Sequence, residues 1–386
     1  MPWRESSVTE ERLRFVVLAS RRERTLSELC AEFGISRQTG HTWVKRFTEQ
    51  GSNGLGNRSR RPKASPRKTP DEVERAVIAV REKWPDWGAP KLVKMLEQQE
   101  PPVKMNVRTL HRILRRNGLV DQNGRGSPAV KRFEREAPNE LWQMDFKGPQ
   151  GFNKANPVGP LSVLDDHSRY LLALQHLGST RKEGVRSTLE ESFEENGLPD
   201  SMLIDHGIPW WNAASPWGLT ELSVWIMRVG VRLIYSGVRH PQTQGKVERM
   251  HGALQQAVRR RKGNPEDQSW LDEFRLEYNH IRPHAALGMQ TPASRWQPSS
   301  RRFRQQIAEW EYPESMQVFR LGEQGFLRWQ GRKWAISAAL VKLTVGIEVI
   351  DSRAIVYFCR TPMRELDLET GESLPISSAP IRCLRP

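Results

Sequence analysis

The sequence holds 386 residues and carries a formal net charge of +15, from 60 Lys and Arg against 45 Asp and Glu. This length allows two or three domains, and the excess of positive charge favours a polyanionic partner because phosphate neutralisation releases counterions. The cysteines, Cys30, Cys359 and Cys383, form no CxxC pair, which excludes a disulfide framework and a cysteine-rich zinc site. The sequence shows neither a membrane-spanning apolar run nor a signal peptide, so we expect a soluble, cytoplasmic protein with no membrane partner.

Residues 1–56 predict an all-α helix-turn-helix unit. One helix is followed by a second that begins with a capping box of Thr25 and Glu28. Gly34 suits the turn, and Ser36 caps a third helix. Short helices around such a turn are typical of DNA-binding proteins, although an ordinary helical hairpin is the alternative. The residues that we expect to face DNA are Arg37, Gln38, Thr39, His41 and Lys45.

Residues 57–70 predict a basic linker. Its prolines and serines oppose a packed core. Its basic side chains suit either a solvated connector or a segment that lies along DNA phosphates. The residues that we expect on DNA here are Arg58, Arg60 and Arg61.

Residues 71–120 repeat the helical pattern and predict a second helix-turn-helix unit. Asn106 is the expected cap of its last helix, and Gly118 ends that helix. Two such units in tandem suit a long, asymmetric DNA site. The residues that we expect to face DNA are Arg108, His111, Arg112 and Arg115. Residues 121–137 then form another polar linker.

Residues 138–296 change to strands that alternate with helices. Three strand-like segments are followed by a helix, a strand, a helix, a short strand at Val231–Tyr235 and a long helix at Gly245–Arg261. This order predicts an α/β ribonuclease-H-like core. Residues 297–386 predict a linker and a small all-β barrel, because short strand-like segments alternate with tight turns such as the one at Gly331.

Three acidic residues stand at the ends or starts of these elements. Asp145 lies in the segment LWQMDF, Asp205 lies in MLIDHG, and Glu248 lies one turn into the long helix. Taken singly, each acid is more typical of a solvated surface residue or a helix cap. Together, carboxylates are the ligands that Mg²⁺ prefers, and two such ions roughly 3.5–4 Å apart activate an attacking oxygen and stabilise a leaving one.

The segments around these acids carry a resemblance. In order, WQMDF, IDHG, HPQTQGKVER and YNHIRPHAALGMQTP resemble the signature segments of DDE transposases from bacterial insertion sequences, which belong with the retroviral integrases. The segments WGAPKL and RTLHRILRRNGL in the front half resemble them too. The resemblance implies that Asp145, Asp205 and Glu248 are the catalytic triad. It also implies that these acids bind two Mg²⁺ ions, which Mn²⁺ can replace.

The resemblance extends to DNA contacts near the triad. Gln244 matches the flexible-loop glutamine that lies near the DNA end in the integrases, and we expect Lys246 and Arg249 to contact DNA beside it. The sequence also departs from the family. His206 stands where Asn is common, and the spacing from Asp205 to Glu248 is longer than in many of these enzymes. Gly252 and Gln255 occupy positions where the integrases have lysines, so we expect different contacts with the DNA end.

The function implied is that of a bacterial, nucleoid-associated transposase. It binds the terminal inverted repeats of an insertion sequence, cleaves each 3′ end and transfers that strand into target DNA. Its partners are double-stranded DNA and further copies of itself, as a dimer or higher homo-oligomer. The alternatives are a catalytically inactive DNA-binding regulator of the same fold and a ribonuclease-H-like nuclease without joining activity.

Other polar residues admit simpler interpretations. Asp165 and Asp166 suit a hairpin turn better than a metal site, and His251 is a candidate phosphate contact. Tyr278 would suggest a tyrosine recombinase, but no matching set of Arg and His surrounds it in the sequence.

Overall fold

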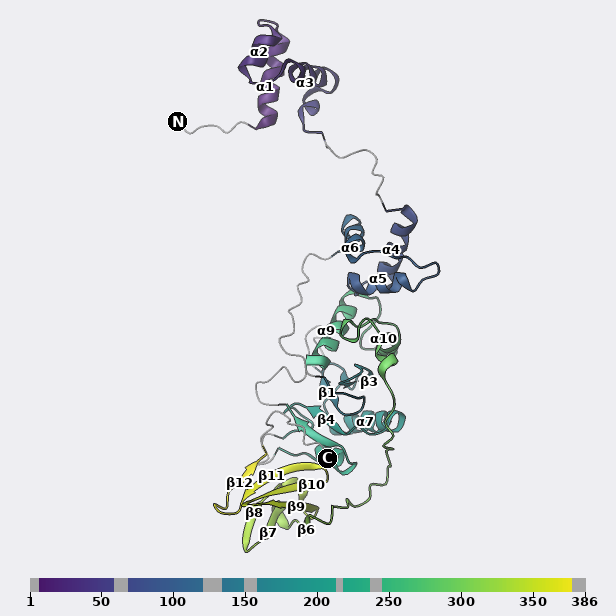
Figure 1. Ribbon diagram of the computed structural model, residues 1–386, viewed down its shortest axis with the longest axis vertical. Coiled ribbons are helices and arrows are strands. Elements are labelled where there is room, and N and C mark those ends of the chain that lie inside the picture. Colours follow the sequence, from purple (N-terminus) through teal and green to yellow (C-terminus); the bar gives the residue numbers. More distant parts are fainter. Residues whose placement is uncertain are drawn as a thin grey trace. The chain divides into compact units, whose positions relative to one another are not determined.

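The computed structural model describes residues 7–58, 69–120, 134–148, 158–212, 218–236 and 245–376 (Figure 1). The chain divides into two compact units, residues 1–69 and 70–386. Among the expected DNA contacts, Arg60, Arg61 and Gln244 lie outside the described residues. Over the ranges described, no helix is both long and apolar enough to cross a bilayer.

The first unit is the expected helix-turn-helix domain. Its elements are α1 (Val8–Arg21), α2 (Leu26–Glu32), α3 (Arg37–Gln50) and the 3-10 helix η1 (Gly51–Leu55). The predicted capping box of Thr25 and Glu28 is present at α2, and the Ser36 hydroxyl accepts from the backbone N–H of Thr39 at α3. Gly34, between α2 and α3, has a φ of +62°, which side chains with a Cβ rarely adopt. The core of this unit is made by Phe15, Val16, Leu29, Cys30 and Leu55.

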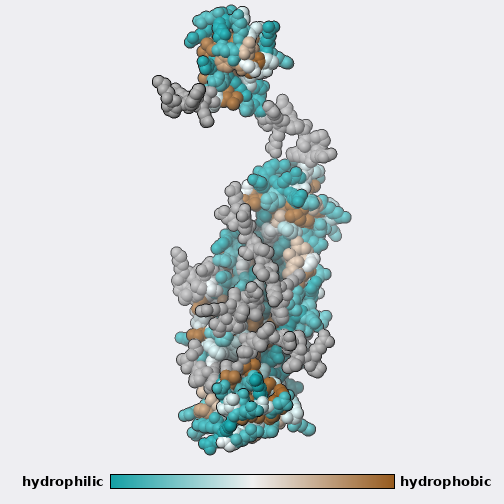
Figure 2. Space-filling view, turned by 60° about the vertical axis from the view of Figure 1, so that its left-hand side comes forward, coloured by the Kyte–Doolittle hydropathy of each residue, from teal (hydrophilic) through white to brown (hydrophobic). Residues whose placement is uncertain are grey.

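The second unit begins with three more helices, α4 (Asp71–Lys83), α5 (Ala89–Glu97) and α6 (Val107–Arg116). Asn106 caps α6, as expected, by accepting a hydrogen bond of 2.8 Å from the backbone N–H of Arg108. Leu110 and Leu114 on α6 share one apolar cluster with Leu92 and Leu96 on α5. The basic side chains of α6 are therefore left on its exposed side. Figure 2 shows that the surface over the helical parts is mainly hydrophilic, with apolar side chains in small groups.

A five-stranded mixed sheet forms the middle of the second unit. The strands are β1 (Trp142–Phe146), β2 (Leu161–Asp165), β3 (Leu171–Gln175), β4 (Ser201–Ile204) and β5 (Arg232–Tyr235). They lie in the order β3-β2-β1-β4-β5. The neighbours β1–β2 and β2–β3 are antiparallel, whereas β1–β4 and β4–β5 are parallel. This is the ribonuclease-H-like arrangement that the element order predicts.

Helices cover both faces of this sheet (Figure 1). They are α7 (Lys182–Asn196), α8 (Glu221–Arg228), α9 (Gly245–Arg260) and α10 (Gln268–His280). On one face, Trp142 and Met144 of β1 pack with residues of α7 and α8. On the other, Leu164 and Leu171 pack with residues of α9 and α10. Successive side chains along a strand point to opposite faces of the sheet, so one face packs on α7 and α8 and the other packs on α9 and α10.

The C-terminal part is all-β, as expected. Its strands are β6 (Gln317–Arg320), β7 (Phe326–Trp329), β8 (Arg332–Ala335), β9 (Thr344–Ile350), β10 (Arg353–Phe358), β11 (Thr361–Asp367) and β12 (Ser373–Pro375). Short 3-10 helices lie at Ala285–Leu287, Pro292–Arg295, Glu323–Gly325 and Ala338–Leu340. The predicted hairpin around Gly331 is β7–β8, and β9–β10 form another.

The C-terminal strands form one five-stranded and one two-stranded antiparallel sheet. Closure into a barrel stays a prediction. Leu327 and Val345 of these sheets belong to the same apolar cluster as Trp142 of β1. The C-terminal sheets therefore pack on the α/β core and share its interior.

Candidate catalytic site

The sheet topology brings the first two acids of the predicted triad to one edge. β1 and β4 are parallel and pair Trp142 with Met202 and Gln143 with Leu203. Continuing this register places Asp145, near the end of β1, beside Asp205, directly after β4. The third acid, Glu248, lies in the first turn of α9.

Buried polar contacts hold the start of α9 against β1. The side chain of Gln143 is fully buried, and its Oε1 accepts a hydrogen bond of 3.3 Å from the backbone N–H of Val247. Its Nε2 donates to Asp166 Oδ1 at 2.8 Å. The ammonium of Lys246 forms an ion pair with the same carboxylate. These contacts fix the helix turn that carries Glu248.

The three acids influence one another electrostatically. The pKa of Asp145 is raised to about 7, first by burial and then by the negative charge of Asp205, with a further contribution from Glu248. Lys147 acts in the opposite direction. Among the described residues, no Lys or Arg forms an ion pair with any of the three acids. The site therefore gathers negative charge that no ion pair with Lys or Arg in the described ranges neutralises, and the charge of Lys147 offsets it only in part.

His251 lies next to Asp145 but does not supply a positive charge. Its Nδ1 is 3.8 Å from Asp145 Oδ2, and its Nε2 shares a hydrogen bond of 2.9 Å with the Ser162 hydroxyl. Burial lowers the pKa of His251 to about 3, so the ring is neutral at physiological pH. His251 is buried, and its described contacts are with protein groups rather than with a phosphate at the surface.

The loop after β4 orients Asp205. Asp205 Oδ1 accepts hydrogen bonds from the backbone N–H of Gly207 at 2.9 Å and from Trp210 Nε1 at 2.6 Å. A Cβ at Gly207 would lie 2.9 Å from Asp205 Oδ1, so this close approach favours glycine. The unusual His206 packs edge-on against Trp211, with ring centroids 4.5 Å apart, and does not take part in either hydrogen bond.

The three acids are chemically suited to bind a divalent metal ion, although their side chains are not grouped as closely as the ligands of one ion. Asp145, Asp205 and Glu248 offer only carboxylate oxygens, which are the ligands that Mg²⁺ prefers. A divalent cation would remove the repulsion that raises the pKa of Asp145. In the part of the chain that the structure describes, no three His, Cys, Asp or Glu side chains are grouped tightly enough to hold a metal ion.

Most of the described residues expected on DNA are exposed. On α3 these are Arg37, Gln38, His41 and Lys45; on α6 they are Arg108, His111, Arg112 and Arg115; Arg58 and Arg249 are exposed as well. An open groove of about 750 Å³ lies along the first turns of α6 and is lined partly by Arg108, His111 and Arg112. Both helices thus present basic side chains to solvent.

Two expected DNA contacts are placed differently. Lys246 is largely buried, with 14% of its side chain exposed, and it pairs with Asp166. Thr39 is half-buried, and its hydroxyl lies 2.9 Å from that of Ser36 in the cap of α3. Thr39 thus contributes to the cap of α3, whereas Lys246 pairs with a buried carboxylate in the turn after β2.

The simpler interpretations of the remaining candidates are confirmed. Asp165 accepts from the backbone N–H groups of Asn139 and Ser168, which ties the hairpin turn together. Tyr278 is 4% exposed and packs in the core beneath α9, so its hydroxyl is not presented to a substrate.

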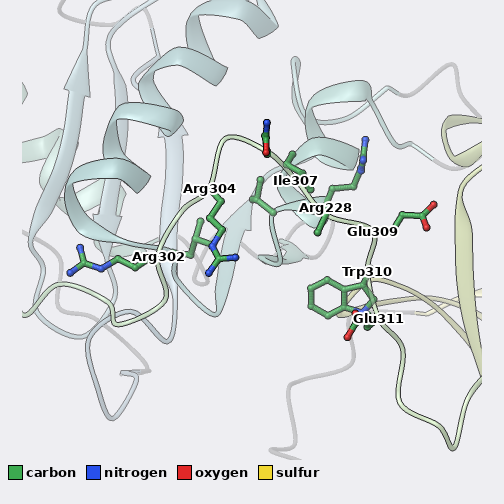
Figure 3. A pocket seen from close by; sticks show the side chains of 11 residues that line it. Arg228, Arg302, Arg304, Ile307, Glu309, Trp310 and Glu311 are labelled. Carbon is green, nitrogen blue, oxygen red and sulfur yellow. The ribbon is translucent and has the colours of Figure 1, made fainter.

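Figure 3 shows a separate cavity, which has a volume of about 430 Å³. Arg228, at the end of α8, and Arg302 and Arg304, from the extended segment after the core, line it together with Trp310. None of the acids of the predicted triad lines this cavity. It is a feature of the packing between the core and the extended segment 302–311 rather than of the candidate catalytic site.

Sequence reasoning missed the residues that support the acids. Gln143 and Trp210 contact the triad region through side chains, yet their positions in the sequence do not indicate this. The Gln143 side chain points away from its strand neighbours to an atom of α9, which is distant in the sequence. The only available signal is that a buried strand carries a polar residue that needs a partner.

Comparisons with known families agree with the geometry. Residues 11–63 match a helix-turn-helix domain, and residues 39–114 match a homeodomain-like domain. Residues 135–241 and 229–292 match the integrase core domain. The two integrase matches together span Asp145, Asp205 and Glu248.

Solved structures that resemble the chain are viral integrases. The HTLV-2 integrase catalytic core domain in complex with magnesium is 13% identical, with a TM-score of 0.33, over 42% of this chain and 97% of that one. The simian T-cell lymphotropic virus intasome in complex with PP2A regulatory subunit B56 gamma is 14% identical, with a TM-score of 0.36, over 74% and 97%. The catalytic core domain of BIV integrase is 19% identical, with a TM-score of 0.31, over 40% and 92%. The similarity of this chain to the integrases rests on the matches to the integrase core domain.

Proposed function

We propose that this chain, which combines helix-turn-helix domains with an integrase core domain in the manner of DDE transposases of insertion sequences, moves a DNA element. It binds the terminal inverted repeats of the element, cleaves each 3′ end in a metal-dependent step and joins that end to target DNA. The observation that supports this most is that the parallel pairing of β1 and β4 sets Asp145 beside Asp205, while Gln143 holds the first turn of α9, which carries Glu248, against β1.

In this proposal, Asp145, Asp205 and Glu248 hold Mg²⁺, with Mn²⁺ as a substitute, as two ions. When bound, the metal supplies activation of the attacking oxygen and stabilisation of the leaving oxygen. Trp210 and the backbone of Gly207 keep the Asp205 carboxylate in one orientation. Gln143 anchors the first turn of α9 and so limits where the Glu248 carboxylate can reach.

The two reactions exchange phosphodiester bonds and need no covalent enzyme intermediate. First, a water oxygen attacks the phosphorus at the end of the element, and the 3′ oxygen leaves as a free hydroxyl. Then that 3′-OH attacks a phosphodiester of the target, and a target 3′ oxygen leaves. One P–O bond forms and one breaks in each step, so no ATP is consumed.

The remaining assignments of the proposal concern binding and assembly. Residues 1–56 and 71–120 read the terminal repeats through α3 and α6, with the linker 57–70 on phosphates, and 138–296 carry the chemistry. Residues 297–386 supply a linker and a small β-barrel. Two ends must be held together for joining, so the active form is a homo-oligomer, a dimer or larger, associated with the bacterial nucleoid.

The test is a joining assay with the purified full chain. Labelled duplexes that end in the terminal repeat are incubated with plasmid and Mg²⁺. A pre-cut end with a 3′-OH should be joined to the plasmid, EDTA should stop the reaction, and an end with a 3′-deoxy terminus should bind without being joined. Binding of ends without cutting or joining in either Mg²⁺ or Mn²⁺ would instead favour the regulator. Nicking that is equal with both termini, and no joined product, would favour the nuclease.

A further inference from the structure

The turn between α4 and α5 contains a buried acid whose charged partners belong to the α/β core. The Asp86 side chain is fully buried. Its Oδ1 accepts a hydrogen bond of 2.8 Å from Arg261 Nε, and its Oδ2 accepts one of 2.9 Å from Arg282 Nη1. Arg261 directly follows α9, and Arg282 follows α10. Both guanidinium groups that bind Asp86 therefore belong to the α/β core and not to the part formed by α4, α5 and α6.

These arginines are themselves held in place by the core. Arg261 makes a second, bidentate pair with Glu277 of α10, at 2.8 and 2.6 Å. The guanidinium of Arg282 lies 5.6 Å from the ring centre of Trp87, the residue next to Asp86. A guanidinium group is planar and donates its hydrogen bonds in fixed directions, so it fixes the orientation of a bound carboxylate as well as its distance. Arg261 and Arg282 therefore form a rigid binding site for the Asp86 carboxylate, which we call the Asp86 socket.

A further contact extends this socket along the same turn. Arg260 Nη1, at the end of α9, donates to the backbone carbonyl of Pro85 at 3.0 Å. Trp84 and Trp87 stack on each other with ring centroids 4.9 Å apart, which makes the turn itself stiff. A buried carboxylate that left this socket would lose both of its guanidinium partners, and that loss is strongly unfavourable. The turn and the end of α9 are therefore expected to stay together.

Helix α9 connects this socket to the candidate catalytic site. Glu248 lies in the first turn of α9 and Arg261 directly after its last residue. At the rise of an α-helix, the two positions are about 20 Å apart along the axis. At the other side of the socket, α5 follows the Asp86 turn and packs on α6 through Leu92, Leu96 and Leu110. A continuous set of stiff elements thus runs from α6 to Glu248.

We propose that Asp86, Arg261 and Arg282 are positioning residues, which fix the distance between the DNA segment read by α6 and the phosphodiester that meets the three acids. This rests on the proposed function. The consequence is that the cut falls at one nucleotide of the end, set by the Asp86 socket and the length of α9. With the socket broken, α6 still reads its DNA segment and the acids still cut, but the cut position is no longer fixed.

The experiment maps the cut at single-nucleotide resolution with the full chain. Asp86→Asn removes the charge and keeps the shape, and Arg282→Lys is a milder change on the core side that leaves α4–α6 intact. Glu221→Gln is the matched control, because it removes an exposed carboxylate that is paired with Lys182 elsewhere on the core. Each protein is given end duplexes of the native spacing and duplexes with base pairs inserted between the α6 segment and the cut.

The wild type and Glu221→Gln should cut the native duplex at one position and cut the inserted duplexes poorly. Asp86→Asn and Arg282→Lys should bind the native end as tightly as the wild type, cut at several neighbouring nucleotides and tolerate insertions. Amide hydrogen exchange without DNA should show faster exchange around Asp86 and Arg261, with unchanged protection in β1. A merely structural role would lower the yield of cutting without moving its position.

Two results would overturn the inference. If Asp86→Asn and Arg282→Lys cut at the wild-type position and reject inserted duplexes as the wild type does, the residues do not position DNA. Exchange around the socket that is unchanged in both variants would show that it does not hold the two parts together. A wild-type chain that cuts no end at all would overturn the proposed function, and only then would the inference fall with it.

Discussion

The two ends of helix α9 hold acids in opposite electrostatic settings. At its start, burial and then the charges of Asp205 and Glu248 raise the pKa of Asp145, and none of the three acids is paired with Lys or Arg among the described residues. At its end, Asp86 is fully buried, whereas Asp145 and Asp205 are half-buried and Glu248 is exposed. Two guanidinium groups donate to both oxygens of Asp86. Acids that are paired with arginine hold packed elements together, whereas clustered acids without such partners are suited to bind a metal cation. The difference separates carboxylates for chemistry from carboxylates for position.

The largest expected contrast is in activity. Asp145→Asn, Asp205→Asn and Glu248→Gln should each lower cleavage and joining by about three orders of magnitude or more, because residues that act as a unit fail together. End binding should stay near the wild-type level, since affinity comes mainly from basic residues elsewhere. Gel-shift and joining assays check both. Substantial strand transfer by any of the three variants would remove that residue from the site.

A large opposite effect is expected on stability at the other end of α9. Asp86→Ala leaves Arg261 and Arg282 buried without their shared partner, and breaking a buried pair in this way costs about 3–5 kcal/mol. Urea unfolding followed by circular dichroism measures the loss. A change that is indistinguishable from the wild type would mean that water replaces Asp86 without cost.

The pH dependence of stability sharpens the comparison. Burial and Asp205 raise the pKa of Asp145 to about 7, against 3.8 for the ordinary group. The folded state therefore holds a proton that the unfolded state has lost, so this group stabilises the metal-free protein below pH 3.8 and that stability is lost as pH rises through 7. Asp145→Asn should make the metal-free chain more stable at pH 8, by up to about 4 kcal/mol at 1.36 kcal/mol per unit of pKa shift. Thermal unfolding at pH 4 and pH 8 checks this, and a destabilised variant at pH 8 would contradict it.

The smallest effect is expected for DNA reading by single side chains. Arg37→Ala or Gln38→Ala should reduce discrimination between the terminal repeat and random DNA by about 1–3 kcal/mol, if the contact is bidentate to a base. Arg58→Ala should instead weaken binding to every sequence and lower the salt dependence. Competition binding at several salt concentrations distinguishes the two. Equal, sequence-independent losses would reject the division between base reading and phosphate contact.

Local signals in the sequence were sufficient to predict the helix caps and the order of the helices and strands. The capping box of Thr25 and Glu28 and the cap at Asn106 are formed by near neighbours, so a pattern of types at fixed spacing predicts them. The alternation of strands and helices likewise predicts the mixed sheet, since side-chain periodicity reflects which face is buried. Asp145 and Asp205 lie at the ends of apolar strand-like segments, but it is the resemblance of the surrounding segments to DDE transposases that identifies them as a predicted triad.

Contacts between distant segments could not be predicted in the same way. Gln143 reaches the backbone of Val247, and Asp86 reaches Arg261 and Arg282, across loops whose geometry no spacing rule fixes. The same limit misplaced Lys246, which looks like a surface cation beside Glu248 until the buried Asp166 is known to face it. The burial of Lys246 depends on the position of Asp166, and that position is known only once the chain is folded.

Binding of Mn²⁺ tests the central claim most directly, because it reports on the acids without requiring DNA or turnover. Paramagnetic resonance of free Mn²⁺ during titration with the full chain measures how many ions bind and how tightly. We predict that the wild type and Asp86→Asn bind Mn²⁺ alike at pH 8, whereas Asp145→Asn and Asp205→Asn lose most of that binding. Equal binding by the wild type and Asp145→Asn would contradict the account, as would loss of binding in Asp86→Asn alone.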